Sequence, residues 1–272
     1  MTIAALTALH CYPLKSAAGL SLASARIVAT GIEHDRSWML VDQRGRCITQ
    51  RECPRLALLQ PQTTADALLL AAPGLQPLRV PRAQPPATHP VRVWHDDCAA
   101  FDAGDAVAQA LSDWLGRACR LVRFDDRTAR NSDRQWTGGF VAANAFSDGF
   151  PLLVIGAASF TDLNSRLTKT LPMNRFRPNL VLAGLEPYAE DRIDELQFGE
   201  LRLRLVKPCT RCAITTTSQE RGERDGEEPL RTLRSYRYDA SLQGVLFGQN
   251  AIIVAGIGTT LRVGQTATIR WK

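Results

Sequence analysis

Short stretches in which apolar and polar residues alternate recur along most of the chain, and this alternation is the period of a strand with one buried face. Residues 201–206 show it clearly, because arginines separate the leucines there. Residues 213–217 are rich in β-branched side chains, which favour strands. The pattern predicts short strands at residues 24–32, 38–42, 47–50, 68–71, 78–80, 91–94, 180–183, 196–198, 201–206, 213–217, 251–254 and 267–271.

Two segments follow the helical period instead. Residues 102–117 place their apolar side chains on one face, which predicts a helix. A second helix is expected at residues 159–171, where Ser159 and Asp162 form a capping-box pattern before an apolar stripe. Many short strands and few helices predict a mainly β protein of the α+β class, and glycine-containing turns between the strands are typical of barrels and sandwiches.

Length and composition are those of an ordinary globular protein. The chain has 272 residues, 45% of them hydrophobic and 22% charged, which suits one large domain or two modest ones. No apolar run has the length of a membrane span, and the N-terminus does not resemble a signal peptide. Seven cysteines without a framework of spacings fit reduced thiols, so we expect a cytoplasmic protein and no membrane partner.

The net charge of +6 is modest, and the arginines are dispersed rather than grouped in one run. Aromatic residues make up 7% of the chain, and the interleaved aromatics of a base-stacking surface are missing. We therefore do not expect nucleic acid to be the partner. A basic cleft for a phosphorylated ligand fits the charge equally well.

The segment most suggestive of chemistry is the cysteine pair Cys209 and Cys212, beside Lys207 and Arg211. Strand-like sequence precedes and follows it, so we expect the pair on a turn between two strands. A redox pair would require a helix N-terminus, which a run of three threonines does not favour. A structural zinc site would require four ligands, and the other cysteines and the four histidines are scattered.

Two further interpretations of the pair remain. Free cysteines are commonly buried, and the pair would then be small packing residues. Alternatively, one thiolate held among cations is a soft-metal ligand or a nucleophile, because neighbouring positive charge favours the thiolate form.

Several other short segments resemble one known family, in order along nearly the whole chain. In the first half these are residues 12–16 (YPLKS), 31–36 (GIEHDR) and 49–56 (TQRECPRL). In the second half they are residues 174–179 (NRFRPN), 188–191 (YAED), 209–212 (CTRC), 233–237 (LRSYR), 247–250 (FGQN) and 263–265 (VGQ). Together they resemble MOSC domain proteins with an N-terminal MOSC β-barrel domain, in particular the mitochondrial amidoxime reducing component and its bacterial counterparts.

The resemblance implies an N-terminal β-barrel-like domain, which we place at residues 1–122, packed on a MOSC β-barrel domain at residues 123–272. It implies the molybdenum cofactor, Mo-molybdopterin, with Cys212 as the catalytic residue and metal ligand. The remaining cofactor-binding residues that it implies are Lys15, Ser16, Arg36, Ser147, Asp148, Gly149, Arg177, Asn179, Cys209, Thr210 and Arg211. At the level of the family it also implies pyridoxal phosphate binding.

The activity that the resemblance implies is the reduction of N-hydroxylated compounds such as amidoximes, hydroxylamines and N-hydroxylated bases. The chain lacks the cysteine run of an iron–sulfur cluster. We therefore expect a separate electron-donor protein, of the ferredoxin, flavodoxin or cytochrome b5 type. The alternative that the resemblance leaves open is a carrier or binding module for the cofactor or for sulfur as a persulfide, without substrate turnover.

One long polar segment, residues 125–149, belongs to neither predicted helix. Segments of this length in compact proteins are usually functional or mobile. We expect it to form the substrate-side wall of the site, with Trp136 and Arg134 as the residues that would test this expectation.

Overall fold

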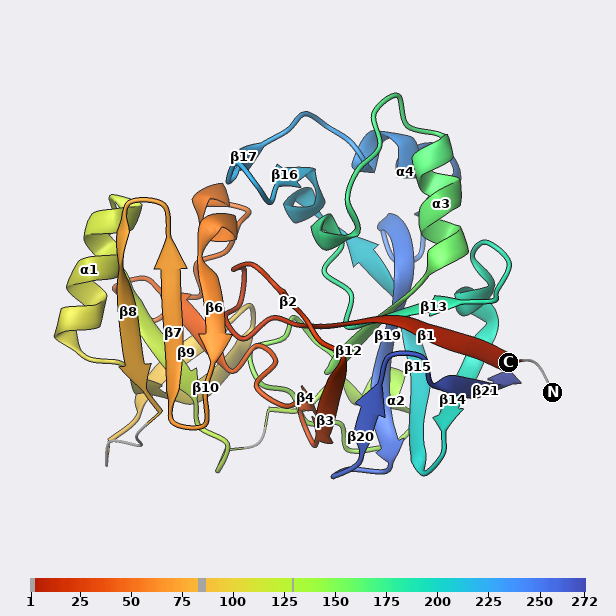
Figure 1. Cartoon of the computed structure of the whole chain (residues 1–272), viewed down its shortest axis with the longest axis horizontal. Helices are drawn as coiled ribbons and strands as arrows, with labels where there is room; N and C mark the ends of the chain where they lie inside the picture. Colours follow the sequence, from red (N-terminus) through yellow and green to blue (C-terminus); the bar gives the residue numbers. More distant parts are fainter. Residues whose placement is uncertain (1–2, 83–86, 129) are drawn as a thin grey trace.

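The computed structural model describes residues 3–82, 87–128 and 130–272, arranged as two lobes (Figure 1). The larger lobe is built on a nine-stranded sheet. Its strands are β1 (Ile3–Cys11), β2 (Leu20–Ser21), β12 (Leu152–Gly156), β13 (Leu180–Ala183), β14 (Ile193–Phe198), β15 (Leu201–Arg211), β18 (Tyr238–Asp239), β19 (Gly244–Ala255) and β21 (Thr266–Trp271).

Seven of these strands close into a barrel, in the order β12-β13-β1-β21-β14-β15-β19, because β19 also pairs with β12. Closure removes the exposed edges that an open sheet would present. Leucines from β1, β13 and β15 fill the interior, and Leu6, Leu182 and Leu203 are all fully buried there. The fold is therefore mainly β, as the alternating pattern predicts.

Strand β1 comes from the start of the chain but belongs to this barrel. It pairs with β13 on one side and with β21, at the end of the chain, on the other. A small sheet of β3 (Ser24–Val28), β4 (Gly31–Ile32) and β20 (Thr260–Arg262) also joins the two ends of the sequence. The division at residue 122 stays a prediction, and the first 32 residues contribute strands to sheets with the second half.

The smaller lobe contains two sheets and the longest helix. One sheet holds β5 (Trp38–Val41), β9 (His89–Val93), β10 (Asp96–Asp102) and β11 (Arg120–Phe124). The other holds β6 (Gln60–Thr63), β7 (Ala67–Ala72) and β8 (Leu75–Pro81), and helix α1 (Asp105–Leu115) packs against β8 and β11. The expected helix at residues 102–117 is thus present, with Gly116 in the left-handed conformation as its C-cap.

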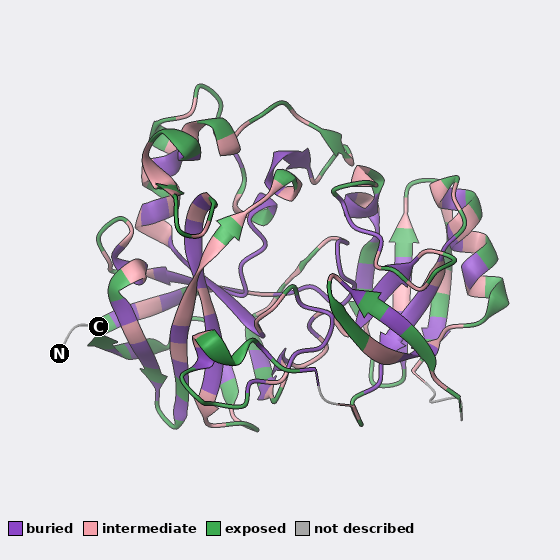
Figure 2. Ribbon diagram, turned by 180° about the vertical axis from the view of Figure 1, so that it is seen from behind, coloured by how far each residue is buried: buried purple, intermediate pink, exposed green. Residues whose placement is uncertain are grey.

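The other regular elements are short. They are α2 (Arg134–Thr137), α3 (Ala157–Ser165), α4 (Leu230–Arg237), β16 (Thr217–Ser218) and β17 (Glu223–Arg224), with the 3₁₀ turns η1 (Pro54–Leu58), η2 (Met173–Arg175), η3 (Ala189–Arg192) and η4 (Ala213–Thr216). Figure 2 shows buried residues along the barrel strands and exposed residues on the outer faces of the helices. Among the described residues, no helix combines the length and apolar character needed to cross a bilayer.

Three local expectations were wrong. Residues 213–217 form mainly the turn η4 rather than a strand, because the hydroxyls of Thr215 and Thr216 each donate to the backbone carbonyl three residues earlier. Strand β15 instead continues to Arg211, so Cys209 lies in a strand and Cys212 lies at its end. Residues 47–50 make only an isolated bridge between Val41 and Cys47.

The third error concerns both ends of helix α3, which runs over Ala157–Ser165 rather than over the expected residues 159–171. Its N-cap is Gly156, and Ser159 lies inside the first turn with its hydroxyl donating to Glu190 at 2.7 Å. Glu190 also accepts from the backbone N–H of Gly156 at 3.1 Å, so a carboxylate from η3 satisfies the helix N-terminus. The helix is therefore capped by Glu190, which is distant in sequence, and not by the predicted capping box of Ser159 and Asp162.

Candidate functional site

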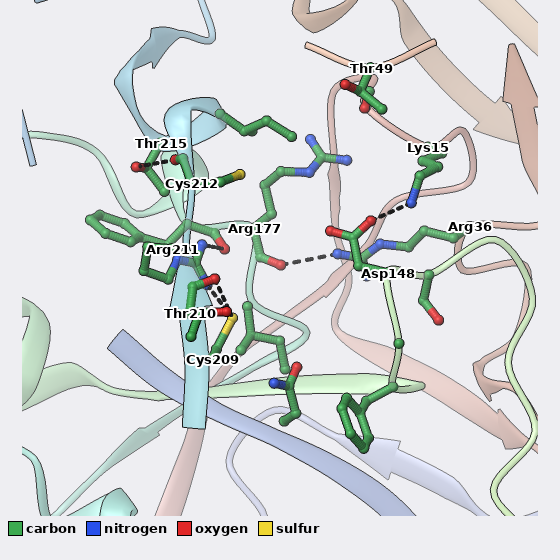
Figure 3. Close-up of a pocket in the computed structure, with 18 of the residues that line it drawn as sticks. Lys15, Arg36, Thr49, Asp148, Arg177, Cys209, Thr210, Arg211, Cys212 and Thr215 are labelled. Carbon is green, nitrogen blue, oxygen red and sulfur yellow. Dashed lines mark hydrogen bonds and ion pairs between the residues drawn. The ribbon is translucent and has the colours of Figure 1, made fainter. Parts of the chain in front are cut away.

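A pocket lies where the barrel lobe meets the smaller lobe (Figure 3). Its volume of about 140 Å³ is several times the roughly 30 Å³ that one water molecule occupies in the liquid, and is far more than a packing defect. It is lined by Lys15, Ser16, Arg36, Thr49, Arg51, Ser147, Asp148, Gly149, Phe150, Leu152, Leu153, Phe176, Arg177, Asn179, Cys209, Thr210, Arg211, Cys212, Ile214, Thr215 and Asn250.

All twelve residues that the resemblance implies for the site line this pocket. They come from four separate segments, around residues 15–36, 147–149, 177–179 and 209–212. In Figure 3 the two cysteines occupy one side, and Lys15, Arg36 and Asp148 face them from the other. The structure thus brings the set together, and the role of each member stays a prediction.

The cationic part of the pocket is built around Tyr12, at the end of β1. The guanidinium carbons of Arg36 and Arg177 lie 4.2 and 4.3 Å from the centre of its ring. Asp35 is buried and accepts from Arg36 at 2.5 Å and from the backbone N–H of Tyr12 at 2.7 Å, whereas Arg177 donates to the carbonyl of Ala17 at 2.5 Å. Burial, and then repulsion by Arg36, lower the pKa of Arg177 to about 10. An anion in the pocket would relieve this excess of positive charge.

Backbone geometry fixes the same residues. Ser16, Arg36 and Arg177 all have positive φ values, of 65°, 47° and 57°. Non-glycine residues seldom adopt this conformation, and strain of this kind concentrates at functional sites. The side chain of Asn179 is buried, accepts from Arg36 at 3.0 Å and donates to the carbonyl of His10 at 3.1 Å, which ties β1 to β13 at the pocket floor.

On the same side of the pocket as Arg36, Lys15 is buried and donates to the carbonyl of Phe146 at 2.8 Å and to Asp148 at 2.5 Å. The indole nitrogen of Trp94 donates to the same carboxylate at 3.1 Å. Although desolvation opposes it, the ammonium of Lys15 lowers the pKa of Asp148 well below its usual range. Asp148 is therefore ionised at neutral pH and can only accept hydrogen bonds.

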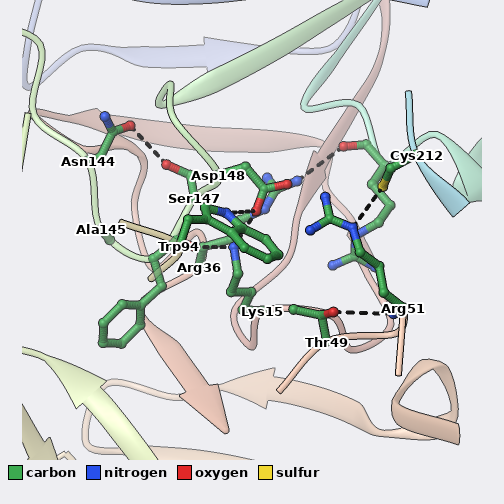
Figure 4. A network of polar contacts seen from close by, with 12 residues as sticks. Lys15, Arg36, Thr49, Arg51, Trp94, Asn144, Ala145, Ser147, Asp148 and Cys212 are labelled. Atoms are coloured by element: carbon green, nitrogen blue, oxygen red, sulfur yellow. Dashed lines mark hydrogen bonds and ion pairs between the residues drawn. The ribbon is translucent and has the colours of Figure 1, made fainter. Parts of the chain in front are cut away.

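Each cysteine sulfur has its own guanidinium donor. Arg211 donates to Cys209 at 3.0 Å and to the carbonyl of Phe176 at 2.5 Å. Arg51, from the smaller lobe, donates through Nε to Cys212 at 3.3 Å (Figure 4). The nearby Cys212 and Asp148 raise the pKa of Arg51, although burial works in the other direction. The thiol of Cys212 thus faces the pocket beside a permanent positive charge.

Arg51 and Thr49 were missed as site residues, although both lie in the segment 49–56 that matches the family pattern. Phe176 was missed in the same way within 174–179. Trp94 carried no signal in the sequence, because only the folded hairpin of β9 and β10 brings its indole to Asp148 and Arg51.

The expected substrate-side wall is only partly supported. Of the polar segment 125–149, residues Ser147 to Gly149 line the pocket, and Trp136 and Arg134 do not. These two belong to α2, which packs against β15, and Trp136 lies under the ammonium of Lys207 at 4.7 Å.

The residues of the pocket fit a metal cofactor that supplies further metal ligands of its own and that carries an anionic group. No three His, Cys, Asp or Glu side chains converge on one point within the described residues, so a metal at Cys212 needs further ligands from a cofactor. A dithiolene supplies soft sulfur ligands that match a thiolate. The guanidinium groups around Tyr12 and the ammonium of Lys15 suit a phosphate.

Comparison with known protein families agrees with this arrangement. Residues 3–118 match the model of the MOSC N-terminal beta barrel domain, and residues 142–270 match that of the MOSC domain. The two matches cover both sides of the pocket. They leave the segment 119–141 between them.

Curated relatives match over most of the chain. Mitochondrial amidoxime-reducing component 1 of Mus musculus is 38% identical over 248 residues, covering 88% of this chain and 73% of the relative. The human protein of the same name is 35% identical over 250 residues, covering 89% and 74%. Mitochondrial amidoxime reducing component 2 of Rattus norvegicus is 36% identical over 271 residues, covering 93% and 80%. The chain belongs to the MOSC domain family, among the proteins that join an N-terminal MOSC β-barrel domain to a MOSC domain and that include the amidoxime-reducing components.

Proposed function

We propose that this protein is a molybdenum-cofactor-dependent oxidoreductase that reduces N-hydroxylated compounds. The reaction is R–NH–OH + 2 e⁻ + 2 H⁺ → R–NH₂ + H₂O, in which the N–O bond breaks and the oxygen leaves as water. The electrons come from a separate donor protein, and the protons come from solvent. The family relationship to proteins named amidoxime-reducing components supports the reaction type.

One observation carries the proposal: Cys212 faces a pocket that Arg177 also lines and whose opposite side holds Lys15 and Arg36 (Figure 3). A soft thiolate and a cluster of phosphate-binding cations are the two ends that a phosphorylated metal–dithiolene cofactor requires. A redox disulfide would need only the cysteine pair, and a structural zinc site would need no cation cluster. The cation cluster therefore favours the cofactor.

The proposal gives each group a task. Cys212 would ligate the metal, and Arg36, Arg177, Lys15 and Ser16 would hold the phosphate. Asn179 and the backbone of 147–149 would orient the pterin. When bound, the molybdenum cofactor supplies the two-electron chemistry, and the protein supplies binding, orientation and charge.

The electron donor and the compartment are further parts of the proposal. A net charge of +6 favours encounter with an acidic donor such as a ferredoxin, a flavodoxin or a cytochrome b5-like protein. All seven cysteines lie within the described residues and are free, which supports a reducing compartment such as the cytoplasm.

The test is reduction of benzamidoxime by an artificial electron donor, with protein from a host that makes the cofactor and with molybdenum and pterin measured per chain. We expect about one equivalent of each and turnover to benzamidine. Molybdenum without turnover of any N-hydroxylated compound would favour the cofactor or sulfur carrier. Neither molybdenum nor pterin would overturn the cofactor assignment.

A further inference from the structure

We propose that Arg51, held against Trp94, is an oxyanion-binding residue on the substrate side of the pocket, so that the preferred substrates are N-hydroxylated compounds that carry a carboxylate or a phosphate. This inference rests on the proposed function, since it names the class of substrate for the same site. It concerns the guanidinium group that donates to Cys212.

Arg51 is fixed at four points. Its carbonyl accepts from Arg224 at 2.7 Å, and its backbone N–H donates to the hydroxyl of Thr49 at 3.2 Å. Its Nε donates to Cys212, and its guanidinium carbon lies 4.2 Å from the centre of the Trp94 ring. A long side chain held in this way loses little further freedom when it binds a ligand.

Trp94 is itself held in place. It lies at the tip of the hairpin between β9 and β10 with a φ of 57°, a conformation that bulky residues rarely adopt. Its indole nitrogen donates to Asp148, and the ammonium of Lys15 lies 5.4 Å from its ring. Figure 4 shows Trp94 next to Lys15, with Asp148 above the indole and Arg51 beside Cys212. The strained turn thus serves to place an aromatic surface under Arg51.

The terminal nitrogens of Arg51 remain available. Within residues 3–82, 87–128 and 130–272, no group accepts a hydrogen bond from its Nη1 or Nη2, and the residue is exposed at the pocket rim. The terminal nitrogens of Arg36 and Arg211, by contrast, donate to protein groups. A planar fork with two free donors matches a carboxylate or a phosphate.

The position of Arg51 separates it from the phosphate of the cofactor. Of the cations proposed for that phosphate, Arg36 and Arg177 lie against the Tyr12 ring, and Lys15 and Arg36 lie across the pocket from the cysteines (Figure 3). Arg51 lies at Cys212, the proposed metal ligand. A substrate whose N–OH group reaches a metal on Cys212 would therefore have this fork within reach of its remaining atoms.

The experiment compares charged and neutral substrates in the cofactor-loaded protein with an artificial donor. One pair is 4-carboxybenzamidoxime and benzamidoxime, and the second pair is 6-N-hydroxyadenosine with and without its 5′-phosphate. We expect kcat/KM to favour the charged member of at least one pair by about tenfold, and the pair with the larger ratio identifies carboxylate or phosphate as the preferred group.

The variant Arg51→Gln should lower that ratio about tenfold, and Arg51→Lys should restore part of it. The matched control is Arg55→Gln, because Arg55 also lies over an indole, that of Trp114 at 4.6 Å, but does not line the pocket. Its ratio should equal that of wild type. Equal ratios in wild type and Arg51→Gln, or a preference of wild type for neutral substrates, would overturn the inference.

A binding measurement keeps this outcome separate from failure of the proposed function. Calorimetric titration with 4-carboxybenzamidine and with benzamidine reads the oxyanion site without turnover. The charged ligand should bind about tenfold more tightly to wild type, and this difference should disappear in Arg51→Gln. If no substrate is reduced but wild type still binds the charged ligand more tightly, the proposed function fails and the oxyanion site stands. If wild type binds both ligands equally, the inference fails.

Discussion

The side-chain amides of Gln50 and Gln219 exchange two hydrogen bonds, of 3.1 and 3.0 Å, although 169 positions separate them in the sequence. Gln50 is fully buried and donates also to the carbonyl of Ser16 at 2.7 Å. This pair joins the loop that carries Arg51 to the segment that follows η4. It therefore connects both lobes directly beside the pocket.

A double-mutant cycle should show that this pair is coupled. Gln50→Ala and Gln219→Ala should each lower the free energy of unfolding by about 1–3 kcal/mol. Gln219→Ala leaves the buried amide of Gln50 without its partner, and Gln50→Ala leaves the half-buried amide of Gln219 and the carbonyl of Ser16 without theirs. The double variant should lose less than the sum by about 1 kcal/mol, measured by urea denaturation. The control is Gln109→Ala, because Gln109 is exposed on helix α1. Its unfolding free energy should stay within about 0.5 kcal/mol of wild type. Strict additivity would show that the two amides act independently.

Replacement of Cys212 by serine should abolish turnover or remove molybdenum while the fold persists. The residue is half-buried at a strand end, so its removal leaves no large cavity. Molybdenum and pterin per chain, together with benzamidoxime reduction, are the measurements. Cys98→Ser, a half-buried cysteine in β10 of the smaller lobe, should keep both metal and activity. Full activity in Cys212→Ser would contradict the assignment of Cys212 as the metal ligand.

Arg177 should separate stability from cofactor binding. Its guanidinium is buried close to that of Arg36, so Arg177→Met should leave the cofactor-free protein at least as stable as wild type. The same variant should retain about tenfold less pterin, since a charge-assisted hydrogen bond to the phosphate is lost. Thermal unfolding of cofactor-free protein and pterin analysis of loaded protein check the two halves. A destabilised variant with full pterin content would contradict both.

The buried carboxyl of Glu190 should make stability depend on pH. Burial raises the pKa of Glu190, although Ser159 and the N–H of Gly156 donate to it. Because the folded-state value is above the unfolded one, its contribution to stability is present below about pH 4.5 and is lost as pH rises through the folded-state value. Glu190→Gln should therefore flatten the decline of unfolding free energy between pH 4.5 and neutrality. An unchanged pH profile in this variant would show that Glu190 is not responsible.

Two glycines with similar backbone angles should differ in their tolerance of alanine. Gly248 has a φ of 79°, and a β-carbon there would lie 2.7 Å from Ile155 and 2.9 Å from the carbonyl of Val154. Gly74 has a φ of 76°, with nothing within 4 Å of the same position. Gly74→Ala should cost about 1–2 kcal/mol from the backbone alone, and Gly248→Ala should cost a further ~1–3 kcal/mol from crowding. If chemical denaturation showed the same loss of unfolding free energy in both variants, the strands around Gly248 would have shifted to accommodate the β-carbon.

Much of the secondary structure follows from local pattern. The alternation at residues 201–206 predicted a strand, and β15 is there, because side-chain direction in a strand depends only on the backbone. The apolar spacing in α1 is likewise a property of the local sequence. The turn η4 escaped this reasoning, since its threonine hydroxyls bind the backbone rather than pack on a sheet.

The candidate site likewise combines features that the sequence determines with features that only the fold determines. The sequence by itself determined which residue types are present and, through resemblance, that Lys15, Arg36, Arg177 and Cys212 belong to one set. Only the tertiary structure decided that β1 closes the barrel between β13 and β21, and that Trp94 supports Arg51 against Cys212. Strand periodicity is a local property, whereas barrel closure and the meeting of side chains from distant segments depend on long-range packing that no local pattern encodes.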